Sequence, residues 1–313
     1  MKKVKKFLRI EKRTYFHHKY GTYLHKDRKK QTAIWMSGLL GLSGCFLFIS
    51  AYFLPWIQSS RYLQEKPSDY QIAETQQVSE PSEKLEPISR NNSELEVVVN
   101  NALAELSGTW SVYIYDLKDD SYVEMNTDDE LDAASLYKLF LVEYLEQKLP
   151  YDQWTNTWLV DKSVSDCVYS MLQASDDPCS EDLADYLNLE DIDEFNKING
   201  YDKTSFAGNS GKQTTAKDVG KLFVSLKKGQ VLSDNARRFV FDALYQQNIS
   251  RGIQKGCGDN CRTANKQGEL NGIAYDAGII THGKRDYVLV LMSKGGTFKQ
   301  ISELTKTIDN YLL

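Results

Sequence analysis

The sequence predicts an α+β fold in which an antiparallel β-sheet, built from both chain ends of the folded domain, packs against a mainly helical lobe. Two β-rich stretches lie near the start of that domain, at 109–117 and 121–126. Its middle has apolar residues at helical spacing, and β-rich stretches return before a last helix that starts near 298. Strands from both ends are therefore expected to pair, with a cleft between sheet and lobe. One transmembrane helix is expected before the domain.

An uncharged apolar run at residues 33–57 predicts this transmembrane helix. Its 25 residues are enough, since about 20 cross a hydrocarbon core as a helix. Trp35, Tyr52 and Trp56 stand near its two ends, where aromatic belts form. A cleaved signal peptide is the alternative, but its apolar core would be shorter and no clear small-x-small cleavage site follows.

The charge of the chain predicts how this helix is oriented. Residues 1–30 hold twelve Lys or Arg against two acidic residues, so the other 283 residues carry about −15 of the net charge of −5. Because Lys and Arg stay on the cytoplasmic side, the arm at 1–32 is expected in the cytoplasm and residues 93–313 outside the cell. The arm is interpreted as setting this topology, with contact to anionic lipid as the alternative. The acidic domain does not support nucleic-acid binding.

Residues 58–92 separate the transmembrane helix from the folded domain. They are polar, include three prolines and lack apolar periodicity, which predicts a disordered linker. Residues 93–313 have the size of one domain and show no internal repeat. We therefore expect a cytoplasmic arm, an anchor, a linker and one extracellular domain.

Capping residues and apolar spacing predict the remaining elements in order. A Ser-x-x-Asp capping box opens a helix at 163–174, and Asn-Gly at 199–200 ends a helical stretch at 179–198. Threonine and serine cap two further helices that begin near 214 and 233. The strands predicted to close the sheet are 273–281 and 287–294.

Four cysteines lie in the extracellular domain, and an even number in an oxidising compartment suggests disulfides. Cys257 and Cys261 are close enough to bridge across a tight loop, which leaves Cys167 and Cys179 as the other pair, one of three possible connectivities. A zinc site is disfavoured because C-x-x-x-C without a nearby histidine is a weak pattern. No metal or cofactor is expected.

The scarcity of histidine limits the possible chemistry. Of four histidines, only His282 lies outside the cytoplasmic arm, in a predicted turn where an exposed role is expected. A Ser-His-Asp triad and a site with several histidine ligands are therefore disfavoured. A nucleophile in this domain would need Lys, Asp, Glu or Tyr as its base.

Ser135 and Lys138 offer such a pair at the start of an apolar run. Residues i and i+3 share one face of a helix, so the lysine amine can reach the serine hydroxyl. It can accept that proton only if burial or a second cation lowers its pKa. Taken alone the motif is weak, because Ser-x-x-Lys is common by chance and a serine near a helix cap with a surface lysine explains it better.

Two further motifs change this interpretation. Ser175-Asp176-Asp177 lies in a loop between predicted helices, and Lys266-Gln267-Gly268 lies at the start of a predicted strand pair. In this order the motifs resemble the Ser-x-x-Lys, Ser-Asp-Asn and Lys-Thr-Gly of the serine β-lactamase and penicillin-binding-protein superfamily, above all its class A branch. The resemblance spans roughly residues 108–313, and it implies the β-lactamase/transpeptidase-like fold.

The resemblance also implies a role for each residue. Ser135 would be the acylated nucleophile and Lys138 its general base. Ser175 would pass protons to the leaving group, and Lys266 would hold Ser175 and a substrate carboxylate. The backbone N–H groups of Ser135 and Glu269 would form the oxyanion hole. The substrate-binding positions implied are Asp177, Gln267, Gly268 and Glu269.

Three departures from the family pattern bear on activity. Asp177 replaces asparagine and should raise the pKa of Lys138, which weakens it as a neutral base. Gln267 replaces a threonine or serine, and its longer amide is expected to crowd the substrate carboxylate. The stretch at 200–214 lacks the glutamate that activates the deacylating water in class A enzymes.

These features predict a membrane-anchored extracellular serine hydrolase that acts through an acyl-enzyme, with slow deacylation. The expected partner is a β-lactam or a D-Ala-D-Ala-like cell-wall peptide, and the membrane is contacted through residues 33–57. The alternative is a degenerate module of the same fold that binds cell-wall peptide or protein without turnover. A purely structural ectodomain explains none of the ordered motifs.

Overall fold

A computed structural model describes residues 90–248, 251–259 and 261–313. The basic arm, the predicted transmembrane helix at 33–57 and nearly all of the predicted linker lie outside the described residues. Within the part that is described, no helix combines the length and apolar character that crossing a membrane requires.

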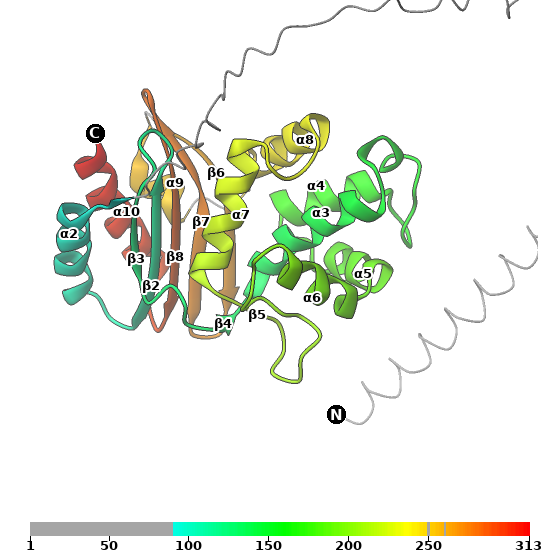
Figure 1. Ribbon diagram of the computed structural model, residues 1–313, viewed down its shortest axis with the longest axis horizontal. Coiled ribbons are helices and arrows are strands. Elements are labelled where there is room, and N and C mark those ends of the chain that lie inside the picture. Colours follow the sequence, from blue (N-terminus) through cyan, green and yellow to red (C-terminus); the bar gives the residue numbers. More distant parts are fainter. Residues whose placement is uncertain (1–89, 249–250, 260) are drawn as a thin grey trace, which may run out of the picture. The chain divides into compact units, whose positions relative to one another are not determined.

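Strands from both ends of the domain form one six-stranded sheet in the order β1-β3-β2-β8-β7-β6 (Figure 1). β2 lies against β8 along its whole length, with Val112 opposite Leu291, so the predicted pairing of the two chain ends is confirmed. All neighbours are antiparallel except β1 and β3, which run parallel. The strands are β1 (Arg90–Asn91), β2 (Thr109–Asp116), β3 (Ser121–Met125), β6 (Cys261–Leu270), β7 (Ile273–His282) and β8 (Arg285–Lys294).

Each face of the sheet is covered by helices. Helices α2 (Ser93–Ala104), α9 (Ile253–Cys257) and α10 (Phe298–Leu312) pack on one face around an apolar cluster. Helix α7 (Ala216–Lys228) lies on the other face, between the sheet and the helical lobe (Figure 1). Gly220 makes this approach possible, because a Cβ there would come within 2.3 Å of the Tyr113 ring. β8 is buried on both faces, as its run of apolar residues requires.

The helical lobe is built around α3. Nine consecutive residues of this helix, 137–145, are buried, as expected of a helix enclosed by its neighbours. Predicted capping serines Ser163 and Ser233 each accept a hydrogen bond from the backbone three residues on. The lobe contains α3 (Tyr137–Lys148), α4 (Val164–Gln173), α5 (Asp177–Leu187), α6 (Leu189–Ile198) and α8 (Asp234–Tyr245), with short 3-10 turns η1 (Ala134–Leu136) and η2 (Tyr151–Gln153). A two-stranded sheet joins β4 (Leu131–Asp132) to β5 (Gln213–Thr214).

The structure corrects several boundaries. The helical stretch expected at 179–198 is two helices, α5 and α6, because Asn188 adopts a left-handed φ of +67° that ends the first. Helices α2 and α9 lie where no helix was predicted, and both owe their positions to packing on the sheet. β6 begins at Cys261, so the Lys-Gln-Gly motif occupies the second half of a long strand instead of its start.

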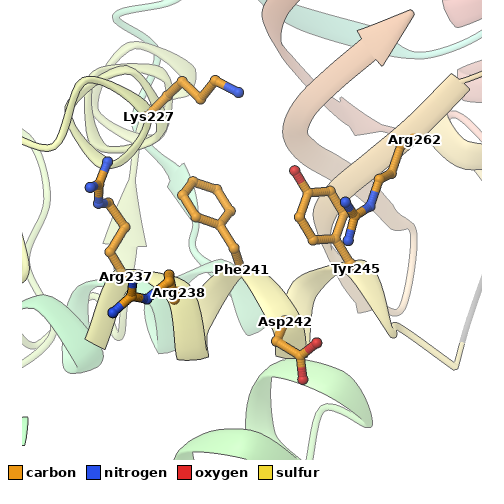
Figure 2. Close-up of a pocket in the computed structure, with 7 residues that line it drawn as sticks. All are labelled: Lys227, Arg237, Arg238, Phe241, Asp242, Tyr245 and Arg262. Atoms are coloured by element: carbon orange, nitrogen blue, oxygen red, sulfur yellow. The ribbon is translucent and has the colours of Figure 1, made fainter. Parts of the chain in front are cut away.

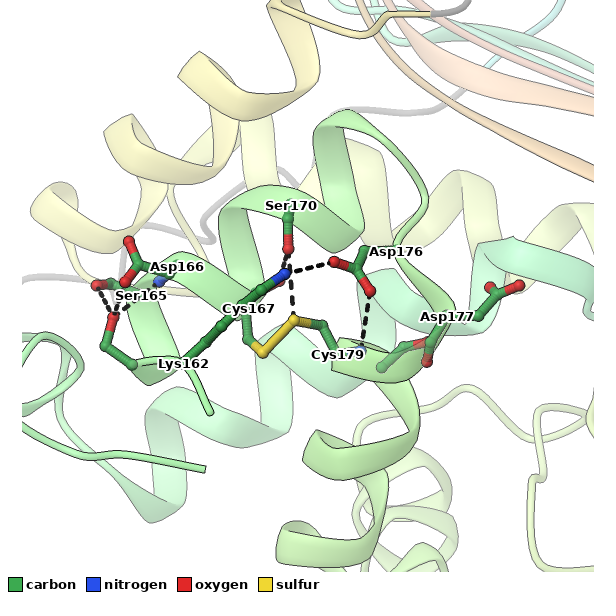
Figure 3. Close-up of a disulfide and its surroundings, with 10 residues drawn as sticks. Lys162, Ser165, Asp166, Cys167, Ser170, Asp176, Asp177 and Cys179 are labelled. Atoms are coloured by element: carbon green, nitrogen blue, oxygen red, sulfur yellow. Dashed lines mark hydrogen bonds and ion pairs between the residues drawn. A yellow bond between two sulfur atoms is a disulfide. The ribbon is translucent and has the colours of Figure 1, made fainter. Parts of the chain in front are cut away.

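Both expected disulfides are present. Cys167 and Cys179, with Cα atoms 5.0 Å apart, link α4 to α5 across the loop that contains Ser175 (Figure 3). Cys257 and Cys261, with Cα atoms 6.0 Å apart, link α9 to β6. One bridge therefore braces a loop of the candidate site, and the other joins a helix to the sheet.

Candidate active site

Ser135 lies in the turn η1, directly before α3 and beside β6. The preceding Ala134 has a left-handed φ of +44°, an uncommon conformation for a residue with a side chain, and its N–H donates to Asp132 Oδ1 at 2.9 Å. A Cβ on Gly268 would meet Ala134 Cβ at 3.1 Å and Ser135 N at 3.5 Å. Glycine at this point of β6 therefore lets the strand run close to the backbone of the candidate nucleophile.

Ser175 is presented by the loop between α4 and α5. Its φ of +58° is also left-handed. Asp176 anchors the loop, since it caps α5 through Cys179 N at 3.1 Å and pairs with Lys162 Nζ at 2.7 Å (Figure 3). The Cys167–Cys179 bridge holds the same loop. A residue in an uncommon backbone conformation persists only where the surrounding structure holds it, as these contacts hold Ser175.

Three side chains, Ser135, Lys138 and Lys266, converge on Ser175. Its Oγ lies 3.0 Å from Ser135 Oγ and accepts hydrogen bonds from Lys266 Nζ at 2.9 Å and Lys138 Nζ at 3.2 Å. These contacts join Ser135, Lys138, Ser175 and Lys266 in one hydrogen-bonded cluster. Among the described residues, however, Lys138 makes no hydrogen bond to Ser135, so the nucleophile connects to both lysines through Ser175.

The two lysines are buried but differ in their partners. Lys138 Nζ donates to Ser175 O at 2.8 Å and to Asp177 Oδ1 at 2.6 Å. Burial lowers the pKa of Lys138. The Asp177 carboxylate opposes that shift by raising the pKa, which is the direction predicted from the sequence. Lys266 bonds Ser175 Oγ and Gln267 O instead, and within the described part of the chain it forms no ion pair with a carboxylate. Burial, together with the neighbouring Lys138 cation, lowers the pKa of Lys266 to about 7.

Gln267 lies on the other face of β6, so the expected crowding of a substrate carboxylate is wrong. Its Nε2 donates to Asp276 Oδ2 at 2.9 Å, and its side chain is buried. Asp276 contacts α9 through Ile253 N at 2.8 Å, which places this pair on the face opposite the helical lobe. The physical reason is the two-residue period of a strand, which turns Lys266 and Gly268 to one face and Gln267 to the other.

Asp276 is the main feature that the sequence interpretation missed. Its buried carboxylate accepts hydrogen bonds from Asn265, Gln267 and the backbone of Ile253. Burial raises the pKa of Asp276 to about 6. The three hydrogen bonds and the charge of Lys266 oppose that rise. The available signal was one acidic residue inside an otherwise apolar strand, Ile273–His282.

The remaining predicted positions lie at the edge of this cluster. The Asp177 side chain is 77% exposed and faces solvent beyond Lys138. The Glu269 side chain forms an ion pair with Arg251 at 2.6 Å, so only its backbone N–H is left for the oxyanion role implied by the resemblance. His282 bonds Asp309 at the far end of β7 and is 17% exposed, which corrects the exposed role expected for it.

Two surface depressions of the described domain contain none of the four converging residues. One, of about 360 Å³, is lined mainly by cations of α7, α8 and β6 with two aromatic rings (Figure 2). The other, of about 520 Å³, includes Glu143 and Glu146 of α3. Among the described residues, no cluster of three or more His, Cys, Asp or Glu side chains is arranged to hold a metal ion.

Comparisons with known proteins identify the family and the fold of the domain. The model of a family described as "Beta-lactamase enzyme family" matches residues 94–312. PBP-A superposes with a TM-score of 0.65 at 15% identity, covering 72% of this chain and 98% of its own. A variant of PBP-A, solved as an acyl-enzyme complex with penicillin G, has a TM-score of 0.64 at 15% identity, with coverage of 72% and 98%.

A β-lactamase from Sphaerobacter thermophilus superposes with a TM-score of 0.61 at 18% identity, covering 71% of this chain and 96% of its own. At such identities the likeness to solved structures concerns the fold. No curated protein matches the chain in sequence.

Proposed function

Because the chain belongs to the β-lactamase enzyme family, we propose that it is a serine hydrolase that forms an acyl-enzyme on Ser135. One observation carries the proposal: Ser135 Oγ lies 3.0 Å from Ser175 Oγ, which two buried lysines hold at 2.9 Å and 3.2 Å. This arrangement offers the serine hydroxyl a route for its proton without a histidine.

The proposed substrate is a β-lactam or a D-Ala-D-Ala-like cell-wall peptide. Support comes from the PBP-A variant that was solved as an acyl-enzyme with penicillin G. Residues 33–57 would anchor the chain in the membrane, with the hydrolase domain outside the cell and the basic arm in the cytoplasm. The substrate would then be met on the outer side of the membrane.

We further propose that the acyl-enzyme is hydrolysed slowly. The segment after α6, residues 200–214, contains no glutamate. Its backbone is instead held by Asp193 and Asp218, which accept hydrogen bonds from Phe206 N and Lys203 N. Both carboxylates hold this backbone, and without the glutamate of the family pattern we expect the acyl group to persist.

Labelling of Ser135 tests the proposed function. A domain comprising residues 90–313 and the full-length chain would each be incubated with a fluorescent penicillin and, separately, a fluorophosphonate. We expect covalent labelling of wild type, none of Ser135→Ala, and release of the penicilloyl label over hours. A folded wild-type protein that stays unlabelled by both probes would refute the acyl-enzyme, and equal labelling of Ser135→Ala would refute Ser135 as nucleophile.

The degenerate binding module is the second candidate, and the Lys138–Asp177 ion pair favours it. Burial lowers the pKa of Lys138, but the carboxylate at 2.6 Å opposes that shift and favours the charged form of the lysine that the family pattern would use as base. Labelling separates the two candidates, because a binding module would take up a D-Ala-D-Ala peptide reversibly, by equilibrium titration, without forming a covalent adduct with either probe.

A further inference from the structure

We propose that Lys266, acting through Ser175, is the proton acceptor that activates Ser135, and that Lys138 with Asp177 is a fixed ion pair that holds the relay in place. The inference rests on the proposed acyl-enzyme function. It exchanges the roles that the family resemblance implies for the two lysines.

The contacts of Lys138 leave it poorly suited to accept a proton. Its Nζ is fully buried and donates three hydrogen bonds, to Asp177 Oδ1, Ser175 O and Ser175 Oγ, at 2.6, 2.8 and 3.2 Å. An ammonium group has three N–H donors, so all of them are used. Losing one proton would leave Asp177 without its cation and one of the three acceptors without a donor. Lys138 also makes no hydrogen bond to Ser135 among the described residues.

Lys266 is placed differently. Its Nζ donates to Ser175 Oγ at 2.9 Å and to Gln267 O at 3.2 Å, and no carboxylate of residues 90–248, 251–259 or 261–313 forms an ion pair with it. Its side chain is 1% exposed, so water does not stabilise the charge. A neutral amine here keeps two N–H groups, and its lone pair can accept the Ser175 proton.

The charges that surround Lys266 come from three elements. Burial is the largest effect on its pKa, and the Lys138 cation on α3 lowers it further. Asp276 on β7 and Asp177 on α5 raise it. Asp276 is held by Asn265, Gln267 and Ile253 on the other face of β6. The net result, a pKa of about 7, lets Lys266 be substantially neutral at physiological pH.

The proton path balances over the full acylation step. As Ser135 Oγ bonds to the substrate carbonyl carbon, its proton moves to Ser175 Oγ, and the Ser175 proton moves to the lone pair of neutral Lys266 Nζ. When the C–N bond breaks, the Lys266 ammonium returns a proton to Ser175, which donates one to the leaving nitrogen. The products are the acylated Ser135 and a neutral amine, with Lys266 neutral again.

Lys266→Arg is the discriminating variant, with the rate of fluorescent-penicillin labelling followed from pH 5 to 9. Wild-type labelling should rise with pH and level off above about 7, because neutral Lys266 is required. Arginine keeps the charge but does not deprotonate in proteins. We expect a loss of roughly 100-fold or more across the pH range, the scale of general-base catalysis. Wild-type-like labelling of Lys266→Arg would overturn the proposal, since a purely electrostatic role tolerates arginine.

Lys138→Met, alone and combined with Asp177→Asn, gives an independent test in case arginine disturbs the buried site. Removing the Lys138 cation should raise the pKa of Lys266, so the labelling profile of Lys138→Met should move to higher pH. Its plateau should fall by about tenfold, because Lys138 no longer holds Ser175, but labelling should persist because the proton acceptor remains. The double variant Lys138→Met/Asp177→Asn removes both charges, so its labelling profile should move less along the pH axis than that of Lys138→Met. Loss of labelling at every pH in folded Lys138→Met would assign the base to Lys138 and overturn the proposal.

The outcomes distinguish failure of the acyl-enzyme function from failure of the exchanged lysine roles. Absence of wild-type labelling at all pH values refutes the acyl-enzyme itself. Wild-type labelling together with an active Lys266→Arg or an inactive Lys138→Met refutes only the exchange of roles. Thermal unfolding of each variant establishes that it is folded before its rate is compared.

Discussion

A single carboxyl oxygen, Asp177 Oδ1, distinguishes the two lysines of this site. The ion pair at 2.6 Å fixes Lys138, although the Asp177 side chain itself is 77% exposed. Solvent screens an exposed carboxylate, so the pair fixes geometry more than it adds stability. Asp177 thus favours the charged form of Lys138.

Asp177→Asn should shift the pH dependence of acylation to lower pH. Asp177 raises the pKa of Lys266 and opposes the lowered pKa of Lys138. Removing its charge should therefore increase the neutral fraction of both lysines below pH 7. We expect several-fold faster penicillin labelling at pH 6 and little change at pH 8. Unchanged or slower labelling at pH 6 would contradict this account of Asp177.

The loop between α4 and α5 acts as a unit that positions Ser175. It combines a left-handed Ser175, an N-cap at Asp176 and the Cys167–Cys179 bridge. Sequence pattern predicted both flanking helices here, yet joined α5 to α6. The break at Asn188 depends on a backbone conformation that helix periodicity does not report.

Removing the Cys167–Cys179 disulfide should slow acylation as well as destabilise the domain. By the loop-entropy relation, a bridge of sequence separation 12 contributes about 3 kcal/mol and one of separation 4 about 2 kcal/mol. Cys257→Ser/Cys261→Ser is therefore a matched control, with similar loss of stability but no link to Ser175. We expect slower penicillin labelling only in Cys167→Ser/Cys179→Ser. Equal slowing in both would mean that the bridge does not position Ser175.

The stability of the whole domain should depend on pH through a buried carboxyl group away from the site. Glu143 of α3 is 6% exposed and accepts a hydrogen bond from Tyr201 Oη at 3.0 Å. Burial raises its pKa from 4.5 to about 7. The folded state therefore binds this proton more tightly than the unfolded state, so the stabilisation is complete below about pH 4.5 and is lost as pH rises through 7.

Glu143→Gln should remove this dependence, since glutamine keeps an acceptor for Tyr201 and carries no charge. The pKa rise from 4.5 to about 7 corresponds to about 3 kcal/mol. Between pH 4.5 and 8, we expect the free energy of unfolding of the variant to increase by up to this amount relative to that of the wild type. Urea unfolding of both proteins at several pH values measures it. A difference that stays constant with pH would show that Glu143 does not titrate as described.

Much of the molecule could be predicted from local patterns. The order of strands and helices, the two disulfides and the convergence of Ser135, Lys138, Ser175 and Lys266 follow from spacing, caps and the resemblance to a known superfamily. Helices α2 and α9 could not be predicted in this way, because their apolar residues are explained only by packing on the face of the sheet that these helices cover. The network around Asp276 was missed for the same reason.

The sequence alone determines which chemistry is open to this protein, because residue types and their order do not depend on packing. Without a suitable histidine, it restricts the base to another residue type. The order of Ser135, Ser175 and Lys266, which resembles the superfamily motifs, makes Ser135 the nucleophile candidate. Tertiary structure decides what those side chains do. The strand period turns Gln267 toward Asp276, the loop places Ser175 between nucleophile and lysines, and Asp177 holds Lys138. A pKa depends on burial and on charges that are distant in sequence, so the choice between the two lysines exists only in the folded chain.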